Sequence, residues 1–498
     1  MNILRNILGN FKSQRVPATV PTDKIVPISD IDYVCDQTME LILRFDDVLD
    51  PEMLRQSLER LLEIGNWRKL GARVRPKGDP AERKFEYHIP EKYDAVRQGF
   101  IYRVSRHSGG INSHPIAARL PRYNHGIPIL GSPQDFTSLS LQPEDPRHLA
   151  DWTYTDLPQL FFHHMTFTDA TVIAMTYPHT LMDGVSHGIF LRAWMSVLHK
   201  REHEVPEVGG FEDYRRPLAE KTSAKSYVLY DNVLGRFETA MFIVRRFLEK
   251  LWVAEEERII CVPGEFVREL RAQAIDELDS SKGNQFLSEN DVILAWFTRT
   301  ILSATKTPGN RSVVLMNSFD IRSVALPPKV EHTFNAVIPS CTIVPISKVL
   351  QQPLAFLATH IRHSLVQQRV SEQIEAWYSL VGARLKQGRF PMIGTSDGLS
   401  VIYSNWDKAG MFRLDLSPAV THKGLPLDQR TNMVGYPSCV FCVTPFSTVG
   451  IRSVGACTGK DAEGNWWFQW LLQKREWENI EKYLGQINGD GLRRSSEN

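Results

Sequence analysis

The stretch from Thr171 to Val185 (TVIAMTYPHTLMDGV) joins a strand pattern to a helix pattern through a short turn. Residues Thr171 to Tyr177 are apolar and β-branched, which predicts a buried strand, and residues Val185 to Lys200 carry apolar side chains at helical spacing. His179 therefore lies where a strand meets a helix. Such a junction holds a side chain on rigid supports at the mouth of a cleft.

Asp183 and Gly184, four and five positions after the histidine, complete the pattern His-x-x-x-Asp-Gly. Asp183 is placed to cap the following helix, and Gly184 permits close approach of another part of the backbone. An unperturbed histidine has a pKa of about 6.5, so the ring of His179 can accept a proton near physiological pH. A structural histidine beside a capping aspartate is the alternative interpretation of the same residues.

The length of the chain indicates two domains. Its 498 residues exceed the roughly 250–300 that one hydrophobic core usually serves. A polar segment with Pro and two adjacent Gly provides the best candidate for a linker. We therefore expect an N-terminal domain at 1–202, a linker at 203–226, a C-terminal domain at 227–487 and a disordered tail at 488–498.

Composition excludes several classes of protein. The chain is 42% hydrophobic and 23% charged, as ordinary globular proteins are, and its formal net charge of +1 argues against a nucleic-acid partner. The first eleven residues are too short and interrupted for a signal peptide or a spanning helix. We expect a soluble, cytoplasmic protein without a transmembrane segment.

Six cysteines are too few for a disulfide scaffold in so long a chain. Most lie in apolar, strand-like contexts, which predicts buried free thiols. Cys439 and Cys442 form a Cys-x-x-Cys pair, but no second ligand pair is near it, so we expect neither a metal site nor redox chemistry there. The six are Cys35, Cys261, Cys341, Cys439, Cys442 and Cys457.

The segment Tyr227 to Trp252 has an apolar pattern interrupted by seven charged residues, which predicts an amphipathic helix. We expect this helix to pack against the body of the protein. A helix that lies on a membrane surface is the alternative.

Several landmarks together resemble the BAHD family of acyl-CoA-dependent acyltransferases, and its fungal secondary-metabolism members more than its plant ones. In chain order they are the helix LDPEMLRQSLERLLE, His179 to Gly184 (HTLMDG), the helix NDVILAWFTRTI, Asp320-Ile321-Arg322, and Ser404-Asn405-Trp406 followed by Asp415. The resemblance covers nearly the whole chain. The sequence Asp415-Leu416-Ser417-Pro418-Ala419 keeps the Asp of the family's Asp-Phe-Gly-Trp-Gly element but neither its aromatic residues nor its glycines.

The resemblance implies an α/β fold of two chloramphenicol-acetyltransferase-like domains, each a mixed β-sheet flanked by helices, with a channel between them. It implies a monomeric enzyme that uses acyl-CoA as co-substrate, binds no other cofactor, and acylates a small-molecule alcohol with an acetyl or another short acyl group. His179 is then the general base. Ser404 and Trp406 are candidates for the pocket around the reacting carbonyl, and the structural residues at the site are Asp183, Gly184, Arg322 and Asp415.

The chemistry suits a histidine in this position. Acyl transfer from a thioester to an alcohol requires removal of the hydroxyl proton as the oxygen attacks, which a neutral imidazole can do. We expect Asp183 to pair with Arg322 and not with the histidine. Two alternatives stay open, namely an enzyme resembling the condensation domains of peptide synthetases and fed by a carrier protein, and a non-catalytic binding protein. Those domains usually carry a second His where this chain has Pro178.

Overall fold

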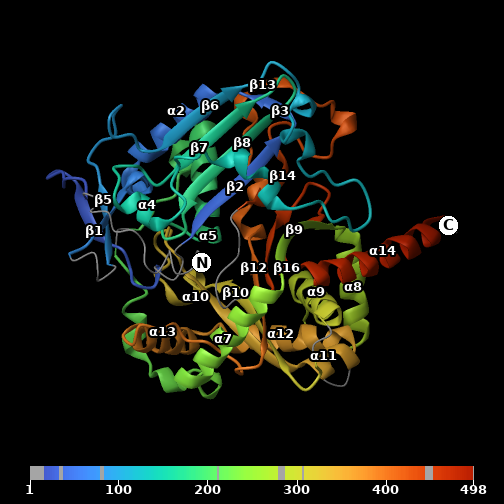
Figure 1. The fold of residues 1–498 in the computed structure, drawn as a ribbon. Coiled ribbons are helices and arrows are strands. Elements are labelled where there is room, and N and C mark those ends of the chain that lie inside the picture. The colour runs from blue at the N-terminus through green and yellow to red at the C-terminus, as the bar shows by residue number, and fades with distance from the viewer. Residues whose placement is uncertain are drawn as a thin grey trace.

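The computed structural model describes residues 16–32, 37–78, 84–209, 212–278, 286–305, 308–443 and 452–496, with side chains described as far as residue 488. Two β-sheets form the centre of the molecule, and helices cover them (Figure 1). Both sheets are mixed, which confirms the predicted fold class. The channel between the two halves stays a prediction.

The first sheet has five strands in the order β14-β2-β8-β7-β6. All neighbouring strands are antiparallel except β6 and β7, which are parallel. Every residue of β8 is buried, as its continuous apolar sequence predicts. The bounds are β14 Pro437–Cys442, β2 Thr38–Phe45, β8 Thr171–Pro178, β7 Phe161–Thr166 and β6 Ile101–Arg106.

The second sheet has six strands in the order β11-β10-β12-β15-β16-β9. β12 lies in its interior between two parallel neighbours, β10 and β15, and the other pairs are antiparallel. The bounds are β11 Val337–Pro345, β10 Ser312–Asp320, β12 Leu399–Asn405, β15 Val454–Lys460, β16 Trp466–Gln473 and β9 Glu255–Val262.

Late segments of the chain return to the first half of the molecule. Strand β14 pairs with β2, and β13 (Val420–Lys423) pairs with β3 (Asp47–Leu49). A linear division at 203–226 does not describe this crossover, and the domain boundaries themselves stay a prediction. The remaining strands, β1 (Lys24–Pro27), β5 (Phe85–Ile89) and β4 (Arg73–Pro76), form a small sheet of their own.

Local capping signals fix the helices that matter most for the site. Asp50 accepts from the backbone N–H groups of Glu52 and Met53 at 2.9 and 3.3 Å, so α2 begins where the Asp-Pro-Glu sequence predicts. α9 begins with an exchange of hydrogen bonds between Ser288 and Asp291, as in a capping box. The helices are α2 Pro51–Glu63, α3 Thr137–Ser140, α4 Leu149–Thr153, α5 Gly184–Leu198, α6 Leu218–Lys221, α7 Arg236–Trp252, α8 Gly264–Asp276, α9 Glu289–Thr305, α10 Arg322–Ala325, α11 Ile346–Gln351, α12 Leu354–Gln368, α13 Ser371–Leu385 and α14 Lys474–Ser496.

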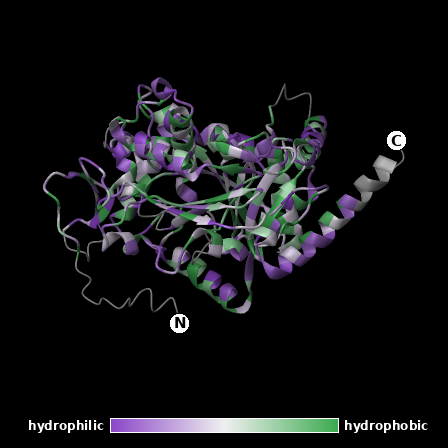
Figure 2. Ribbon diagram, turned by 90° about the horizontal axis from the view of Figure 1, so that it is seen from above, coloured by the Kyte–Doolittle hydropathy of each residue, from purple (hydrophilic) through white to green (hydrophobic). Residues whose placement is uncertain are grey.

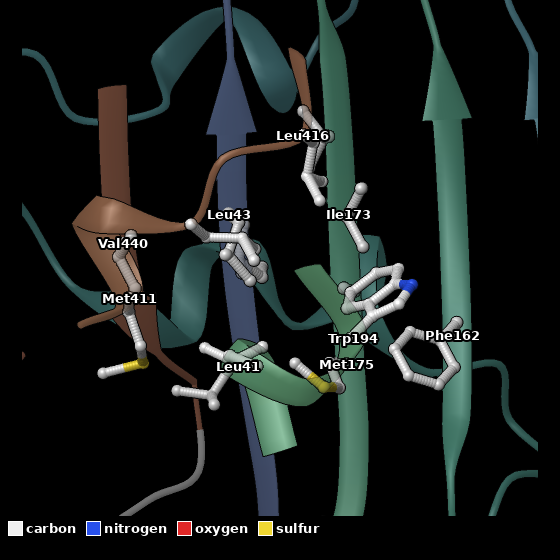
Figure 3. Close-up of a cluster of buried hydrophobic side chains, with 14 of the residues drawn as sticks. Leu41, Leu43, Phe162, Ile173, Met175, Trp194, Met411, Leu416 and Val440 are labelled. Atoms are coloured by element: carbon white, nitrogen blue, oxygen red, sulfur yellow. The ribbon is translucent and has the colours of Figure 1, made fainter. Parts of the chain in front are cut away.

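The largest core lies between the first sheet and α5. Figure 3 shows Leu41 and Leu43 of β2 in one cluster with Met175 of β8, and Trp194 of α5 lies over β8 beside Phe162 of β7. Residues from the returning segment, such as Val440, complete the same cluster. Because this core clamps both β8 and α5, the turn that joins them has little freedom.

α7 differs from the sequence-based expectation. It begins at Arg236 and turns most of its apolar residues to solvent, so the expectation that its apolar side packs against the body is wrong. α14 continues through residues 488–496 and extends away from the body in Figures 1 and 2, and the disordered tail at 488–498 stays a prediction. Asn488 accepts from the backbone N–H of Ile127 at 2.9 Å, which ties this part of the helix to the first half of the chain.

Candidate active site

His179 directly follows β8, and hydrogen bonds hold both its backbone N–H and its backbone carbonyl. Its N–H donates to the carbonyl of Gln37 at 2.7 Å, and its carbonyl accepts from the side-chain amide of Asn335 at 2.9 Å. The side chain is half-buried. Its Nδ1 atom is enclosed and has no hydrogen-bond partner among the described residues. The backbone of the histidine is therefore fixed, while its ring keeps a nitrogen that can still form a hydrogen bond.

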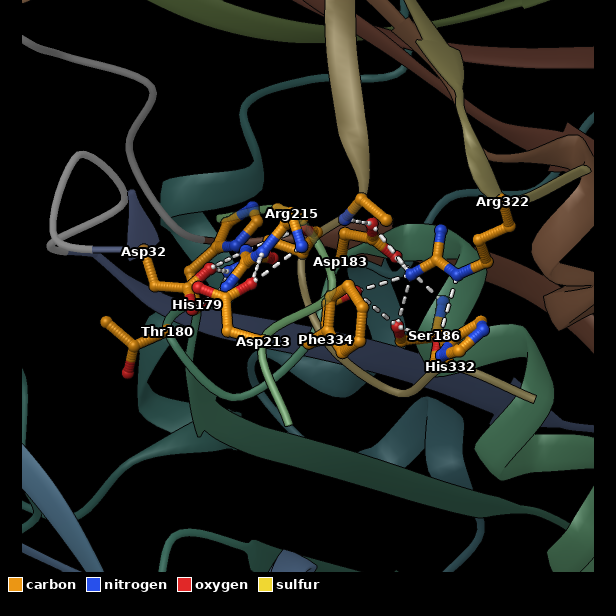
Figure 4. A network of polar contacts seen from close by, with 12 residues as sticks. Asp32, His179, Thr180, Asp183, Ser186, Asp213, Arg215, Arg322, His332 and Phe334 are labelled. Carbon is orange, nitrogen blue, oxygen red and sulfur yellow. Dashed lines mark hydrogen bonds and ion pairs between the residues drawn. The ribbon is translucent and has the colours of Figure 1, made fainter. Parts of the chain in front are cut away.

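Asp183 caps α5 and is fully occupied in doing so. Its carboxylate accepts from the backbone N–H groups of Ser186 at 2.8 Å and Ala336 at 2.7 Å. Nη2 of Arg322 contacts both carboxylate oxygens at 3.1 Å. No hydrogen bond joins Asp183 to His179 among the described residues. The carboxylate thus points into the contact between α5 and the C-terminal half of the chain (Figure 4).

The electrostatics of Asp183 follow from these donors. Burial by itself raises the pKa of its carboxyl, but the charge of Arg322 and the two backbone N–H groups outweigh burial and hold the pKa below its usual value. The pKa of Arg322 is raised, because its neighbours Asp183 and Asp320 outweigh the effect of burial. Both groups are therefore charged at neutral pH.

Arg322 connects more groups than the predicted pair. Its Nε donates to the carbonyl of His332 at 2.9 Å and its Nη1 to Asp320 at 2.7 Å. Besides Asp183, Nη2 reaches the Ser186 hydroxyl at 2.7 Å and the carbonyl of Phe334. The predicted contact with Asp183 is present, but one nitrogen makes it, and not two parallel N–H groups.

A second buried network supports His179 from the other side, and no sequence pattern predicts it. Arg215 grips Asp32 with two nitrogens at 2.7 and 2.9 Å and holds Asp213 through Nε at 2.8 Å. Asn335 donates to Asp32 at 2.9 Å with the same amide that donates to the carbonyl of His179. Figure 4 shows this network beside that of Arg322. Arg215 lies within the segment predicted as a linker, where the spacing Asp-x-Arg is too common to serve as a signal.

Ser404 and Trp406 lie at the end of β12 and contact one another. The indole N–H of Trp406 donates to the hydroxyl of Ser404 at 2.9 Å. The hydroxyl oxygen accepts this bond, so its own proton is left to donate elsewhere. The pair is therefore arranged as a relay in which Trp406 orients the serine.

Two glycines of α5 let the segment that follows β12 approach the helix closely. A Cβ at Gly184 would lie 3.1 Å from Cδ1 of Trp406, and one at Gly188 would lie 2.6 Å from Cα of Ala409. The two positions are four residues apart and share one face of the helix. Gly184 therefore serves close packing against the C-terminal half, and Gly188, which the sequence analysis did not single out, serves the same purpose one turn later.

Asp415 lies at the opposite end of α5 from Asp183. Its carboxylate accepts from the backbone N–H of Ser417 at 2.9 Å, and its carbonyl accepts from Nε2 of His199, the residue after α5, at 3.1 Å. It thus ties the loop after β12 to the end of α5, which agrees with the structural role expected for it.

Metal chemistry finds no support in the described part of the chain, which contains no group of three or more His, Cys, Asp or Glu residues suited to hold an ion. Five of the cysteines are buried thiols there, as predicted, and Cys35 lies outside the described residues. Burial raises the pKa of the Cys439 thiol well above its usual value, so this residue is unsuited to thiolate chemistry.

Comparison with known proteins gives a consistent result. Residues 147–418 match the model described as "Transferase family". The chain is 64% identical to the O-acyltransferase pboC of Aspergillus ustus, over 92% of this chain and 98% of that protein, and 37% identical to the O-acyltransferase ausP of Aspergillus calidoustus, over 98% and 99%. Among solved structures, F. graminearum TRI101 complexed with coenzyme A and T-2 mycotoxin has a similar fold, with a TM-score of 0.67 at 13% identity over 92% of this chain and 97% of that one.

Proposed function

Because this chain belongs to the Transferase family, we propose that it moves an acyl group from acyl-CoA directly to a hydroxyl group of a small-molecule secondary metabolite. The relatives named O-acyltransferase support the reaction class, and the TRI101 complex supports coenzyme A as the carrier of the acyl group and a small molecule as the acceptor. We further propose an acetyl or another short acyl group, no additional cofactor, and a cytoplasmic monomer.

The observation that carries the proposal is the state of His179. Its backbone is held from two sides, yet Nδ1 has no partner among the described residues. A buried polar atom without a partner is unfavourable unless a ligand or water satisfies it. A histidine whose backbone is fixed but whose ring keeps free hydrogen-bonding capacity is what a general base needs.

His179 acts in two steps. A ring nitrogen of the neutral imidazole takes the proton of the acceptor hydroxyl while the oxygen forms a bond to the thioester carbon. The tetrahedral intermediate then collapses, the carbon–sulfur bond breaks, and the imidazolium returns the proton to the leaving thiolate. No acyl-enzyme forms, and holding both substrates together contributes much of the rate.

Ser404 supplies the hydrogen bond to the oxyanion of the intermediate, and Trp406 positions it. The relay between the two leaves the serine proton available, whereas the indole N–H already donates to the serine. Donors of this kind contribute about 10²–10³-fold to kcat. The assignment refines the sequence-based one, which gives both residues as candidates for the pocket around the reacting carbonyl.

The test is release of coenzyme A from acetyl-CoA in the presence of a panel of alcohols, with His179→Ala as the decisive variant. We expect turnover by the wild-type protein and a loss of at least about 10²–10⁴-fold in the variant, with acyl-CoA binding and the fold retained. Variant turnover above a tenth of the wild-type value would exclude the general-base role. Turnover only with an acylated carrier protein would favour the condensation-type reaction, and no turnover with either donor would favour a binding protein.

A further inference from the structure

Helix α7 turns an apolar surface away from the protein. At 3.6 residues per turn, eight apolar residues fall within one arc of about 140° that contains no charged residue. Phe237 and Trp252, near the two ends, are 78% and 84% exposed, and Val244 at the centre is 53% exposed. We call this set the outer face of α7: Phe237, Ala240, Met241, Val244, Phe247, Leu248, Leu251 and Trp252.

The opposite side attaches the helix to the protein through few residues. Phe242 and Arg246 are its buried residues, and Arg246 pairs with Glu255 and, at 3.5 Å, with Glu249. Because these contacts set the rotation of the helix, the outer face cannot turn inward without breaking them. A contiguous apolar surface of this kind in contact with water marks an interaction site.

Two arginines lie along one side of the outer face. Arg245 donates to the carbonyl of Ser396 at 3.3 Å, and Arg311 donates to the carbonyl of Asp397. Neither arginine forms an ion pair with any residue that the structure describes. Both line a hollow between α7 and the start of β12. Glu249 also lines this hollow, where it pairs with Arg246 and Arg452 at 3.5 Å, so the lining arginines outnumber the carboxylate and the hollow presents net positive charge to an anion that approaches this flank.

A second group of arginines lies near the first turn of α7. Arg236, the first residue of the helix, and Arg384, at the end of α13, are both within Coulombic range of Arg389. The segment before α7 is joined to the segment after α13 by a hydrogen bond from the backbone N–H of Leu234 to the carbonyl of Met392 at 2.9 Å. Glu238, which also lies on this turn, is engaged with the backbone N–H of Gly235 at 2.7 Å. Positive charge thus accompanies the outer face at its N-terminal end as well as along one flank.

From this combination we propose that α7 lies on an anionic membrane surface, with its outer face in the boundary between headgroups and acyl chains and Arg245 and Arg311 facing lipid phosphates. Apolar residues on one side with cations beside them are the features of interfacial helices, and an exposed tryptophan such as Trp252 favours the same boundary. No helix in the described part of the chain is long and apolar enough to span a bilayer, so the contact is with one leaflet.

A second copy of the chain fits this surface less well. A two-fold axis through the middle of α7 would place Arg245 of one copy against Arg245 of the other. Like charges in contact are destabilising, whereas anionic headgroups neutralise them. Charge complementarity therefore favours a lipid surface over self-association.

The outer face is separate from the catalytic residues. Ser400, at the start of β12, lines the hollow beside α7, whereas Ser404, at its end, belongs to the candidate active site. Four residues of strand span roughly 13 Å. Substitutions on the outer face therefore test membrane contact without touching the acyl-transfer machinery.

The experiment is sedimentation of the full chain with vesicles of phosphatidylcholine, alone or mixed with phosphatidylserine. We expect the wild-type protein to sediment with the mixed vesicles, less so as salt rises. Leu251→Asp should lower the partition coefficient by at least about tenfold, because it places a charge in the apolar boundary. The matched control is Leu427→Asp, since Leu427 is 56% exposed against 63% for Leu251 but lies away from α7.

A second pair of variants tests the arginines beside the outer face. Arg245→Gln should weaken sedimentation with the mixed vesicles by severalfold and reduce its salt dependence. The control Arg119→Gln, at an exposed position outside α7, should change neither. Failure of the wild-type protein to bind mixed vesicles at low salt would overturn the proposal. Equal binding to both kinds of vesicle would overturn the anionic part. A concentration-dependent dimer that Leu251→Asp dissociates would assign the face to a second copy instead.

Discussion

The two buried aspartate–arginine pairs beside His179 differ in how the arginine holds its partner. Arg215 grips Asp32 with two nitrogens, which is the forked geometry that suits a guanidinium. Arg322 reaches both oxygens of Asp183 with a single nitrogen, while two backbone N–H groups donate to the same carboxylate. Asp183 therefore depends less on its arginine than Asp32 does.

The pairs also act on different parts of the histidine loop. Through Asn335, the Arg215 network reaches the carbonyl of His179 itself. The Arg322 network holds Asp183, four residues later, and joins α5 to the segment around Ala336. The first network therefore holds the backbone from which the proposed catalytic ring of His179 projects, and the second joins the two halves of the chain.

The largest effect should come from Arg215→Met. Removing this arginine leaves the buried carboxylate of Asp32 without its ionic partner, which costs roughly 3–5 kcal/mol of unfolding free energy. Urea denaturation gives the value, and Arg216→Met, at the exposed neighbouring position, is the control. A loss below about 1 kcal/mol would show that the Asp32 pair does not hold the fold.

Arg322→Met should cost less, roughly 2–3 kcal/mol, because the Asp183 carboxylate keeps two backbone donors. Combined with Asp183→Asn, the double variant should lose clearly less than the sum of the single losses. Denaturation of all four proteins of this cycle measures the coupling. Additive losses would refute the pairing, and a larger loss than for Arg215→Met would reverse the ranking of the two networks.

Acid should reduce the stability that the charged form of Asp183 contributes, and comparison with Asp183→Asn isolates this contribution. Its folded-state pKa is lowered below the ordinary 3.8, so the unfolded chain binds the proton more readily, and the stability that the charged form contributes is present above pH 3.8. That contribution is lost as pH falls through the lower folded-state pKa. The difference in stability between the wild-type protein and Asp183→Asn should therefore shrink in this acid range, and a constant difference would contradict the shift.

The contrast between the networks also explains what the sequence could predict. Helix starts such as those at Asp50 and Asp183 rest on hydrogen bonds within three residues, so local patterns suffice to find them. The partner of Asp183 came from the family resemblance, which placed Arg322 by position. Asp32 and Arg215 are 183 residues apart and carry no local signal, so only the fold could bring them together.

The same limit applies to larger elements. The pattern of α7 shows that the helix has an apolar side, but periodicity does not say whether that side faces the body or the outside. The apolar run that forms β14 predicts a strand, but pairing with β2 depends on a crossover between the two halves. Amphipathicity and strand patterns are local, whereas orientation and sheet membership are decided by tertiary packing.

The smallest expected effect, and the one that separates the networks best, is that of Asn335→Ala. This change removes the bond to the carbonyl of His179 and the bond to Asp32, so the loop keeps its ion pairs but loses the link that places the histidine. We expect a loss of about 1–2 kcal/mol in stability and a decrease of about tenfold in kcat at nearly constant KM.

Ser186→Ala is the matched control for that variant. Its hydroxyl bonds to Arg322 and to the carbonyl of Phe334, and no bond from this hydroxyl to His179 occurs among the described residues. A similar loss of stability is expected, because each variant loses the buried hydrogen bonds of its polar side chain, but kcat should change clearly less. If both variants lowered kcat equally, positioning of His179 would not be a property of the Arg215 network, because loosening either network would then disturb the ring in the same way.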